Sequence, residues 1–184
     1  MRGAEGDRPG AGAMDHFLAG VERRAFRMAW FAVGNRDDAL DIVQEAMLKL
    51  VRRYGHHAPG EWPPLFYRIL QSRVRDHLRR ERFRRRWRVW LGHDEASEDP
   101  LADLPAPADA DPAVGAQGDD AVAAVEAAVG ALPLRQQQAF LLRAWEGLDV
   151  AQTAAAMGCS EGSVKTHYAR ALQALRARLE EHRA

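Results

Sequence analysis

The strongest local signal in this 184-residue sequence is the segment Val150-Ala151-Gln152-Thr153-Ala154-Ala155-Ala156-Met157-Gly158-Cys159-Ser160-Glu161-Gly162-Ser163-Val164. Its first half is rich in alanine, which allows close packing of a short helix. Gly158 can adopt the left-handed conformation of a tight turn, and Ser160 can cap a following helix. Together these features, at this spacing, predict a helix-turn-helix.

The second helix of this motif has a buried stripe and a polar amino-terminal end. The stripe comprises Val164, Tyr168, Ala171, Leu172, Leu175 and Leu179. Off the stripe, near the start of the helix, lie Ser163, Lys165, Thr166, His167 and Arg170. Basic side chains can bond guanine or phosphate, and threonine can meet phosphate or a thymine methyl group, so this end is expected to enter a major groove. The competing interpretation is an ordinary two-helix corner with glycine in its turn.

Upstream of the motif, two more helices and a linker are expected. An alanine-rich helix over 121–131 is ended by Leu132-Pro133, and another helix follows over 136–145. The stretch from Leu91 to about Gly118 is rich in Asp, Pro, Ala and Gly, and it carries no lysine or arginine. Proline stiffness and like-charge repulsion predict an extended, solvated linker there.

The amino-terminal half predicts three helices after a disordered leader, Met1 to Ala13. Apolar residues recur at helical spacing from about Asp15 until a break at Gly34-Asn35. A second helix then starts near Asp37, with Asp37 or its neighbour as the cap. The prolines in 56–64 predict a loop, and a third helix is expected to begin near Leu65.

This third helix combines an apolar stripe with a strongly basic face. Its stripe comprises Phe66, Ile69, Leu70, Val74 and Leu78, and its basic face comprises Arg68, Arg75, Arg79, Arg82 and Arg86. The formal net charge of zero therefore combines a basic surface with an acidic connector. No strand-like alternation of useful length occurs. The expected class is all-α, with two small helical domains, 14–90 and 119–184, joined by a flexible acidic linker over 91–118.

Two segments resemble regions of the small, two-domain extracytoplasmic-function (ECF) sigma factors. Residues 132–138, 147–148 and 157–172 resemble sigma region 4, which reads the promoter element near −35. The run Asp37-Asp38-Ala39-Leu40-Asp41-Ile42-Val43-Gln44-Glu45 resembles the helix of region 2 that binds core polymerase. The arginine-rich segment 65–86 resembles the part of region 2 that melts and reads the −10 element.

The resemblance implies roles for particular residues of this sequence. Core polymerase would be bound by Asp41, Gln44 and Glu45. The −10 element would be contacted by Trp62, Arg68, Ser72, Arg75, Arg79 and Arg80. Leu40 replaces a common acidic residue, and Ser72 replaces an asparagine associated with a flipped base. Phe66 is assigned to the core, whereas Trp62 either packs the loop or touches DNA.

Other functional classes find little support in the sequence. It contains no phosphate-cradling glycine loop, no His-Glu zinc motif and only one cysteine, Cys159, so no enzymatic activity, metal or cofactor is expected. Apolar runs too short to cross a bilayer indicate a cytoplasmic protein. The expected partners are core RNA polymerase, promoter DNA and an anti-sigma factor. Alternatives are an autonomous helix-turn-helix regulator of transcription and a module that binds RNA through its arginine run.

Overall fold

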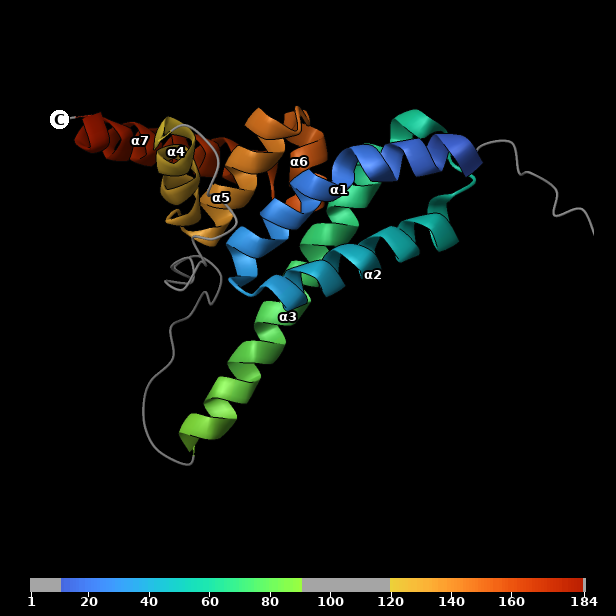
Figure 1. Ribbon diagram of the computed structural model, residues 1–184, viewed down its shortest axis with the longest axis horizontal. Helices are drawn as coiled ribbons and strands as arrows, with labels where there is room; N and C mark the ends of the chain where they lie inside the picture. Colours follow the sequence, from blue (N-terminus) through green and yellow to red (C-terminus); the bar gives the residue numbers. More distant parts are fainter. Residues whose placement is uncertain (1–10, 91–119, 184) are drawn as a thin grey trace, which may run out of the picture.

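A computed structural model describes residues 11–90 and 120–183, and within these ranges all regular structure is helical (Figure 1). In chain order the elements are α1 (Ala11–Val33), α2 (Arg36–Tyr54), η1 (Pro59–Glu61), α3 (Trp62–Trp90), α4 (Asp120–Gly130), α5 (Leu134–Phe140), η3 (Leu141–Trp145), α6 (Val150–Met157) and α7 (Glu161–Arg183). The expected all-α class is confirmed. No helix in these two ranges is both long and apolar enough to cross a membrane.

Helices α1, α2 and α3 form one unit whose turns follow local chemistry. Gly34 takes a positive φ of 72° after α1, as glycine readily does. The cap of α2 is Asn35 rather than Asp37, because the Asn35 Oδ1 accepts from the backbone N–H groups of Asp37 and Asp38 at 2.9 and 3.1 Å. Both aspartates therefore lie in the first turn, where negative charge favours the helix dipole. The helix α1 begins at Ala11, inside the segment predicted as a leader.

Helix α3 starts earlier than its prolines suggested. The prediction of a loop through Pro64 is wrong at its end, since α3 begins at Trp62 and includes Pro63 and Pro64. Proline is tolerated in a first helical turn because the N–H that it lacks would have no partner within the helix. The 3₁₀ turn η1 leads directly into this start.

Helices α4 to α7 form the second unit and contain the predicted helix-turn-helix. Gly158 ends α6 with φ 67° and ψ 43°, and the Ser160 Oγ accepts from the Ser163 N–H at 3.2 Å at the start of α7. The cap of α6 is Asp149, which was not predicted and which forms a reciprocal pair of hydrogen bonds with Gln152. Helix α5 begins two residues earlier than expected, at Leu134, and continues into the π-helical turn η3.

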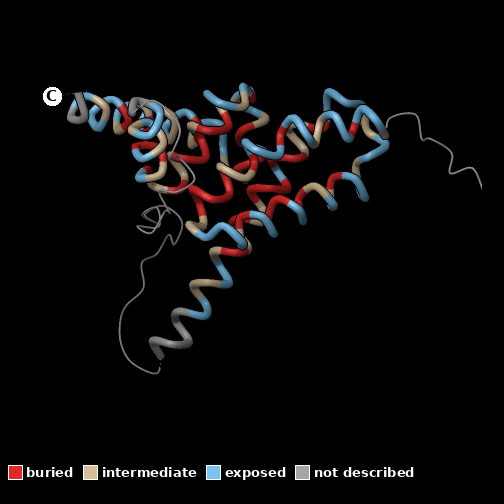
Figure 2. Tube along the Cα trace, in the orientation of Figure 1, coloured by how far each residue is buried: buried red, intermediate tan, exposed pale blue. Residues whose placement is uncertain are grey.

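The two units pack against one another, an arrangement that the sequence did not predict. Helix α6 lies on α3, and α4 lies beside α1, so buried positions run from one unit into the other (Figure 2). At the interface Arg27 pairs with Glu126, and the Gln137 side chain donates to the Phe31 carbonyl at 3.5 Å. The carboxyl end of α3 projects away from this shared core (Figure 1). The predicted linker and the first ten residues lie outside the described residues.

We expect Gly158→Ala to lower the free energy of unfolding by about 1 kcal/mol, because an L side chain is strained at positive φ. The control is Gly162→Ala, which makes the same chemical change within helix α7 and should leave the stability unchanged or raise it. Denaturant unfolding of both variants measures the difference. Equal effects at the two positions would contradict the proposed strain at Gly158.

Candidate nucleic-acid and protein interface

The amino-terminal end of α7 presents the predicted recognition residues. Lys165, Thr166 and Arg170 are exposed, whereas Ser163 and His167 are half-buried. The Thr166 hydroxyl donates to the Gly162 carbonyl at 3.0 Å, which fixes its rotamer while leaving an acceptor and a methyl group outward. The face can therefore offer two cations and a threonine to a groove.

Helix α3 holds the other predicted DNA contacts, in two different settings. Arg68, Arg79 and Arg80 are exposed, and Arg79 also pairs with Asp76 at 2.9 Å. Ser72 is half-buried. The exposed arginines lie on one long helix, so a phosphate backbone could run beside them.

Arg75 differs from its neighbours because it is committed to the second unit. Its Nη1 donates to the carbonyls of Met157 at 2.9 Å and Ala156 at 3.3 Å, at the carboxyl end of α6. Arg135 of α5 donates to the same Met157 carbonyl at 2.9 Å. Burial and the nearby positive charge of Arg135 lower the pKa of Arg75. Two cations thus meet the negative end of one short helix.

Trp62 lies in the core and presents no face to solvent. It is 2% exposed, its Nε1 donates to the Tyr54 carbonyl at 3.2 Å, and its ring lies 5.9 Å from that of Phe17. Of the two roles expected for Trp62, the structure places it in packing of the loop, and DNA contact would require its extraction. Phe66 is fully buried, as expected.

The predicted polymerase-binding residues share one exposed side of α2 with apolar residues that were not predicted to belong to the site. Asp41, Gln44 and Glu45 are all exposed. Beside them are three exposed apolar side chains, which are Leu40, Leu48 and Val51. Positions 40, 44, 48 and 51 follow helical spacing, so this surface is a mixed acidic and apolar strip.

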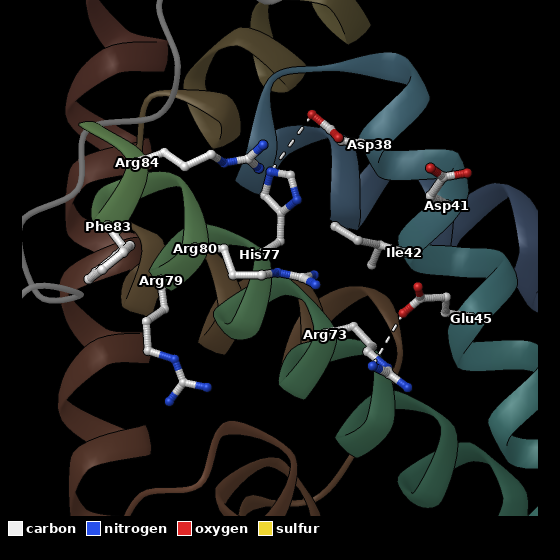
Figure 3. A pocket seen from close by; sticks show the side chains of 10 residues that line it. All are labelled: Asp38, Asp41, Ile42, Glu45, Arg73, His77, Arg79, Arg80, Phe83 and Arg84. Carbon is white, nitrogen blue, oxygen red and sulfur yellow. Dashed lines mark ion pairs between the residues drawn. The ribbon is translucent and has the colours of Figure 1, made fainter. Parts of the chain in front are cut away.

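A hollow of about 750 Å³ lies between α2 and α3 and brings together two sets of predicted residues (Figure 3). It is lined by Asp38, Asp41, Ile42, Glu45, Arg73, His77, Arg79, Arg80, Phe83 and Arg84. Two pairs bridge it: Glu45 with Arg73 at 3.2 Å, and Asp38 with His77 at 3.7 Å. An acidic wall and a basic wall therefore face each other, although the sequence indicated two separate sites.

A second hollow, of about 460 Å³, is mainly apolar and lies between α1 and the second unit. It is lined by Arg27, Phe31, Val122, Val125, Glu126, Val129, Phe140, Ala144 and Trp145. Across residues 11–90 and 120–183, no group of three or more His, Cys, Asp or Glu side chains is arranged to hold a metal ion. The chemistry of these surfaces is that of binding to other macromolecules.

Comparison with known families yields two matches, in the order in which the units occur. Residues 14–84 match the family model for sigma-70 region 2, and residues 123–175 match that for sigma-70 region 4.

Individual relatives agree with these matches. The chain is 32% identical over 171 residues to the ECF RNA polymerase sigma factor SigM of Mycobacterium tuberculosis, covering 91% of this chain and 75% of that protein. It is 28% identical over 179 residues to the ECF RNA polymerase sigma factor SigE of Mycolicibacterium smegmatis, covering 97% of this chain. The chain spans 66% of SigE and 54% of the Streptomyces coelicolor relative BldN.

The fold is also similar to a solved structure. The sigma factor RpoE of Bartonella quintana, crystallised in complex with the anti-sigma factor NepR, superposes with a TM-score of 0.61 at 22% identity. The match covers 92% of this chain and 98% of that one, so the likeness extends over both helical units.

We expect Trp62→Phe to lower the free energy of unfolding by about 1–2 kcal/mol, because it leaves the buried Tyr54 carbonyl without its donor. The same variant should bind single-stranded DNA as tightly as the unmodified chain. Arg68→Gln, at an exposed position, should show the reverse: weaker binding and unchanged stability. Loss of DNA binding by a still-folded Trp62→Phe chain would return Trp62 to the DNA surface.

Proposed function

The chain belongs to the ECF sigma factors of the sigma-70 family, and from that premise we propose that it binds core RNA polymerase and directs transcription initiation at its own set of promoters. The observation that carries the proposal is the presence of a region 2 unit and a region 4 unit in one chain, in that order. An autonomous regulator would need only the helix-turn-helix.

The proposed reader of the −35 element is the amino-terminal end of α7. Its exposed Lys165 and Arg170 can bond guanine or phosphate, and Thr166 can meet phosphate or a thymine methyl group. Ser163 and His167 flank them on the same end of the helix. The Ser160 cap and the left-handed Gly158 fix where this end begins. Recognition thus rests on a rigid helix rather than on a loop.

The proposed surface for the −10 element is the basic side of α3. Arg68, Arg79 and Arg80 would follow the phosphates, and Ser72 would lie near the unpaired strand. Phe83 adds an aromatic face that was not predicted from the sequence, since it is 68% exposed among arginines. Stacking of a base on an aromatic ring contributes about 1–3 kcal/mol, which helps to hold a melted strand open.

The proposed docking surface for core polymerase is the mixed strip on α2. Asp41, Gln44 and Glu45 can meet a basic helical surface, while the neighbouring Leu40, Leu48 and Val51 supply apolar contact. Charge steers the encounter, and burial of the apolar side chains supplies free energy on contact. The apolar residues compensate for the leucine at position 40, where an acidic residue is common in the family.

The remaining elements of the proposal concern partners and place. The chain would act as a dissociable, non-catalytic subunit in the cytoplasm, where polymerase and promoter DNA are found. An anti-sigma factor is included among its partners, by analogy with the NepR complex of the structurally similar RpoE. No cofactor is part of the proposed activity.

The first test is transcription in vitro with the full chain, bacterial core polymerase and a library of genomic fragments. We expect initiation at start sites that share −35 and −10 elements, and no initiation at those sites from core alone. Initiation that fails, together with specific duplex binding by the full chain, would favour the autonomous regulator instead.

The docking surface is tested by Asp41→Arg, which places a positive charge against the proposed basic partner. We expect the affinity for core polymerase to fall by about tenfold or more, because like charges at an interface repel. The fold should be unaffected, since Asp41 is exposed. The matched control is Glu22→Arg on the exposed side of α1, with core binding measured by fluorescence anisotropy. Equal losses for the two variants would move the docking surface elsewhere.

A further inference from the structure

The contact between the two units brings one proposed DNA-binding region against the other. We propose that this closed arrangement is an autoinhibited state of the free chain, held by Glu146 and Arg75, which must open before both promoter elements can be bound at once. The inference rests on the proposed function, because it takes α3 and α7 to act at separate DNA sites.

Glu146 lies at the centre of the closed contact. Its side chain is 3% exposed and accepts from the Arg24 Nε at 3.1 Å and from the Tyr67 hydroxyl. Glu146 follows η3 in the second unit, whereas Arg24 and Tyr67 belong to α1 and α3 of the first. Burial and the charge of Glu146 raise the pKa of Tyr67, which keeps its hydroxyl protonated as a donor. A buried carboxylate is stable only with such partners, so this group favours closure specifically.

Arg75 is the second attachment, and it is also a proposed contact of the −10 element. Its guanidinium is bonded to the carbonyls of Met157 and Ala156, at the end of α6. Gly158 is so close that a methyl group on its Cα would lie 3.8 Å from the Arg75 Nη2. The same Nη1 cannot serve these carbonyls and a DNA phosphate together. Closure thus removes one cation from the basic surface of α3.

The dimensions of a promoter make the closed form incompatible with full binding. Elements near −35 and −10 are about 25 base pairs apart, or roughly 85 Å along the duplex. In the closed form, Arg75 touches the turn that immediately precedes the recognition helix at Glu161. Between Trp90 and Asp120 the chain has 29 residues, 91 to 119, and such a length can span at most roughly 100 Å. Opening to promoter dimensions is therefore within reach of the connection.

The test opens the contact from both sides with opposite changes of charge. Arg24→Gln removes a positive charge from the first unit, and Glu146→Gln removes a negative charge from the second. Arg23→Gln is the matched control, since Arg23 is the exposed neighbour of Arg24 on α1. Circular dichroism establishes that each full-length variant keeps its helices.

Small-angle X-ray scattering then measures the separation of the units, without polymerase or promoter. We expect the unmodified chain and Arg23→Gln to scatter as the compact form, and both other variants to expand measurably. An unmodified chain that is already extended, or variants that all match the control, would overturn the proposal. Because no transcription is involved, either failure is distinct from failure of the sigma function.

Binding to a fluorescent 30-base-pair duplex measures the consequence for DNA. Arg23→Gln and Arg24→Gln have the same net charge, so a difference between them reports closure rather than overall electrostatics. We expect Arg24→Gln to bind roughly threefold to tenfold more tightly than Arg23→Gln, allowing for the partial exposure of the Arg24–Glu146 pair. Its salt dependence should be steeper by about 0.9 for each additional phosphate that the opened chain neutralises. Equal affinities would show that closure does not restrain DNA binding.

Discussion

Helix α3 buries Phe66, Leu70 and Val74 in a core that it shares with α1 and α2, and the positions of the other helices follow from that burial. Because a helix has only one side for its apolar stripe, the arginines of α3 must lie on the remaining sides. One of these sides faces α2 and its carboxylates, and another receives α6. A single amphipathic helix thereby determines both the proposed DNA surface and the site at which the second unit packs.

The packing of the second unit uses polar groups more than apolar ones. Glu146, Arg24 and Tyr67 meet in a buried charged cluster, while Arg75 and Arg135 share the carbonyl of Met157. Buried polar contacts of this kind give orientation, because each is satisfied at one geometry only. They also separate without leaving a large apolar surface in water, which suits a contact that opens and closes.

Local order was predictable from the sequence, whereas long-range pairing was not. Gly158 and Ser160 predicted the helix-turn-helix because each acts through its own backbone. The prolines at 63 and 64 misled, since the same residue that breaks a helix interior is tolerated in a first turn. Arg24 and Glu146 are 122 positions apart, and no periodicity links them. The same holds for the acidic and basic walls of the hollow, whose meeting depends on how α2 and α3 cross.

The ion pair between Glu45 and Arg73 has a thermodynamic consequence, because it joins the proposed polymerase surface to the proposed DNA surface. If a basic group of polymerase takes the carboxylate of Glu45, then the Arg73 guanidinium loses its anion and becomes available to a phosphate. Linkage is reciprocal, so DNA that captures Arg73 strengthens the hold of Glu45 on polymerase by the same factor. The two ligands would then favour each other's binding through one shared pair of side chains, with no change of fold.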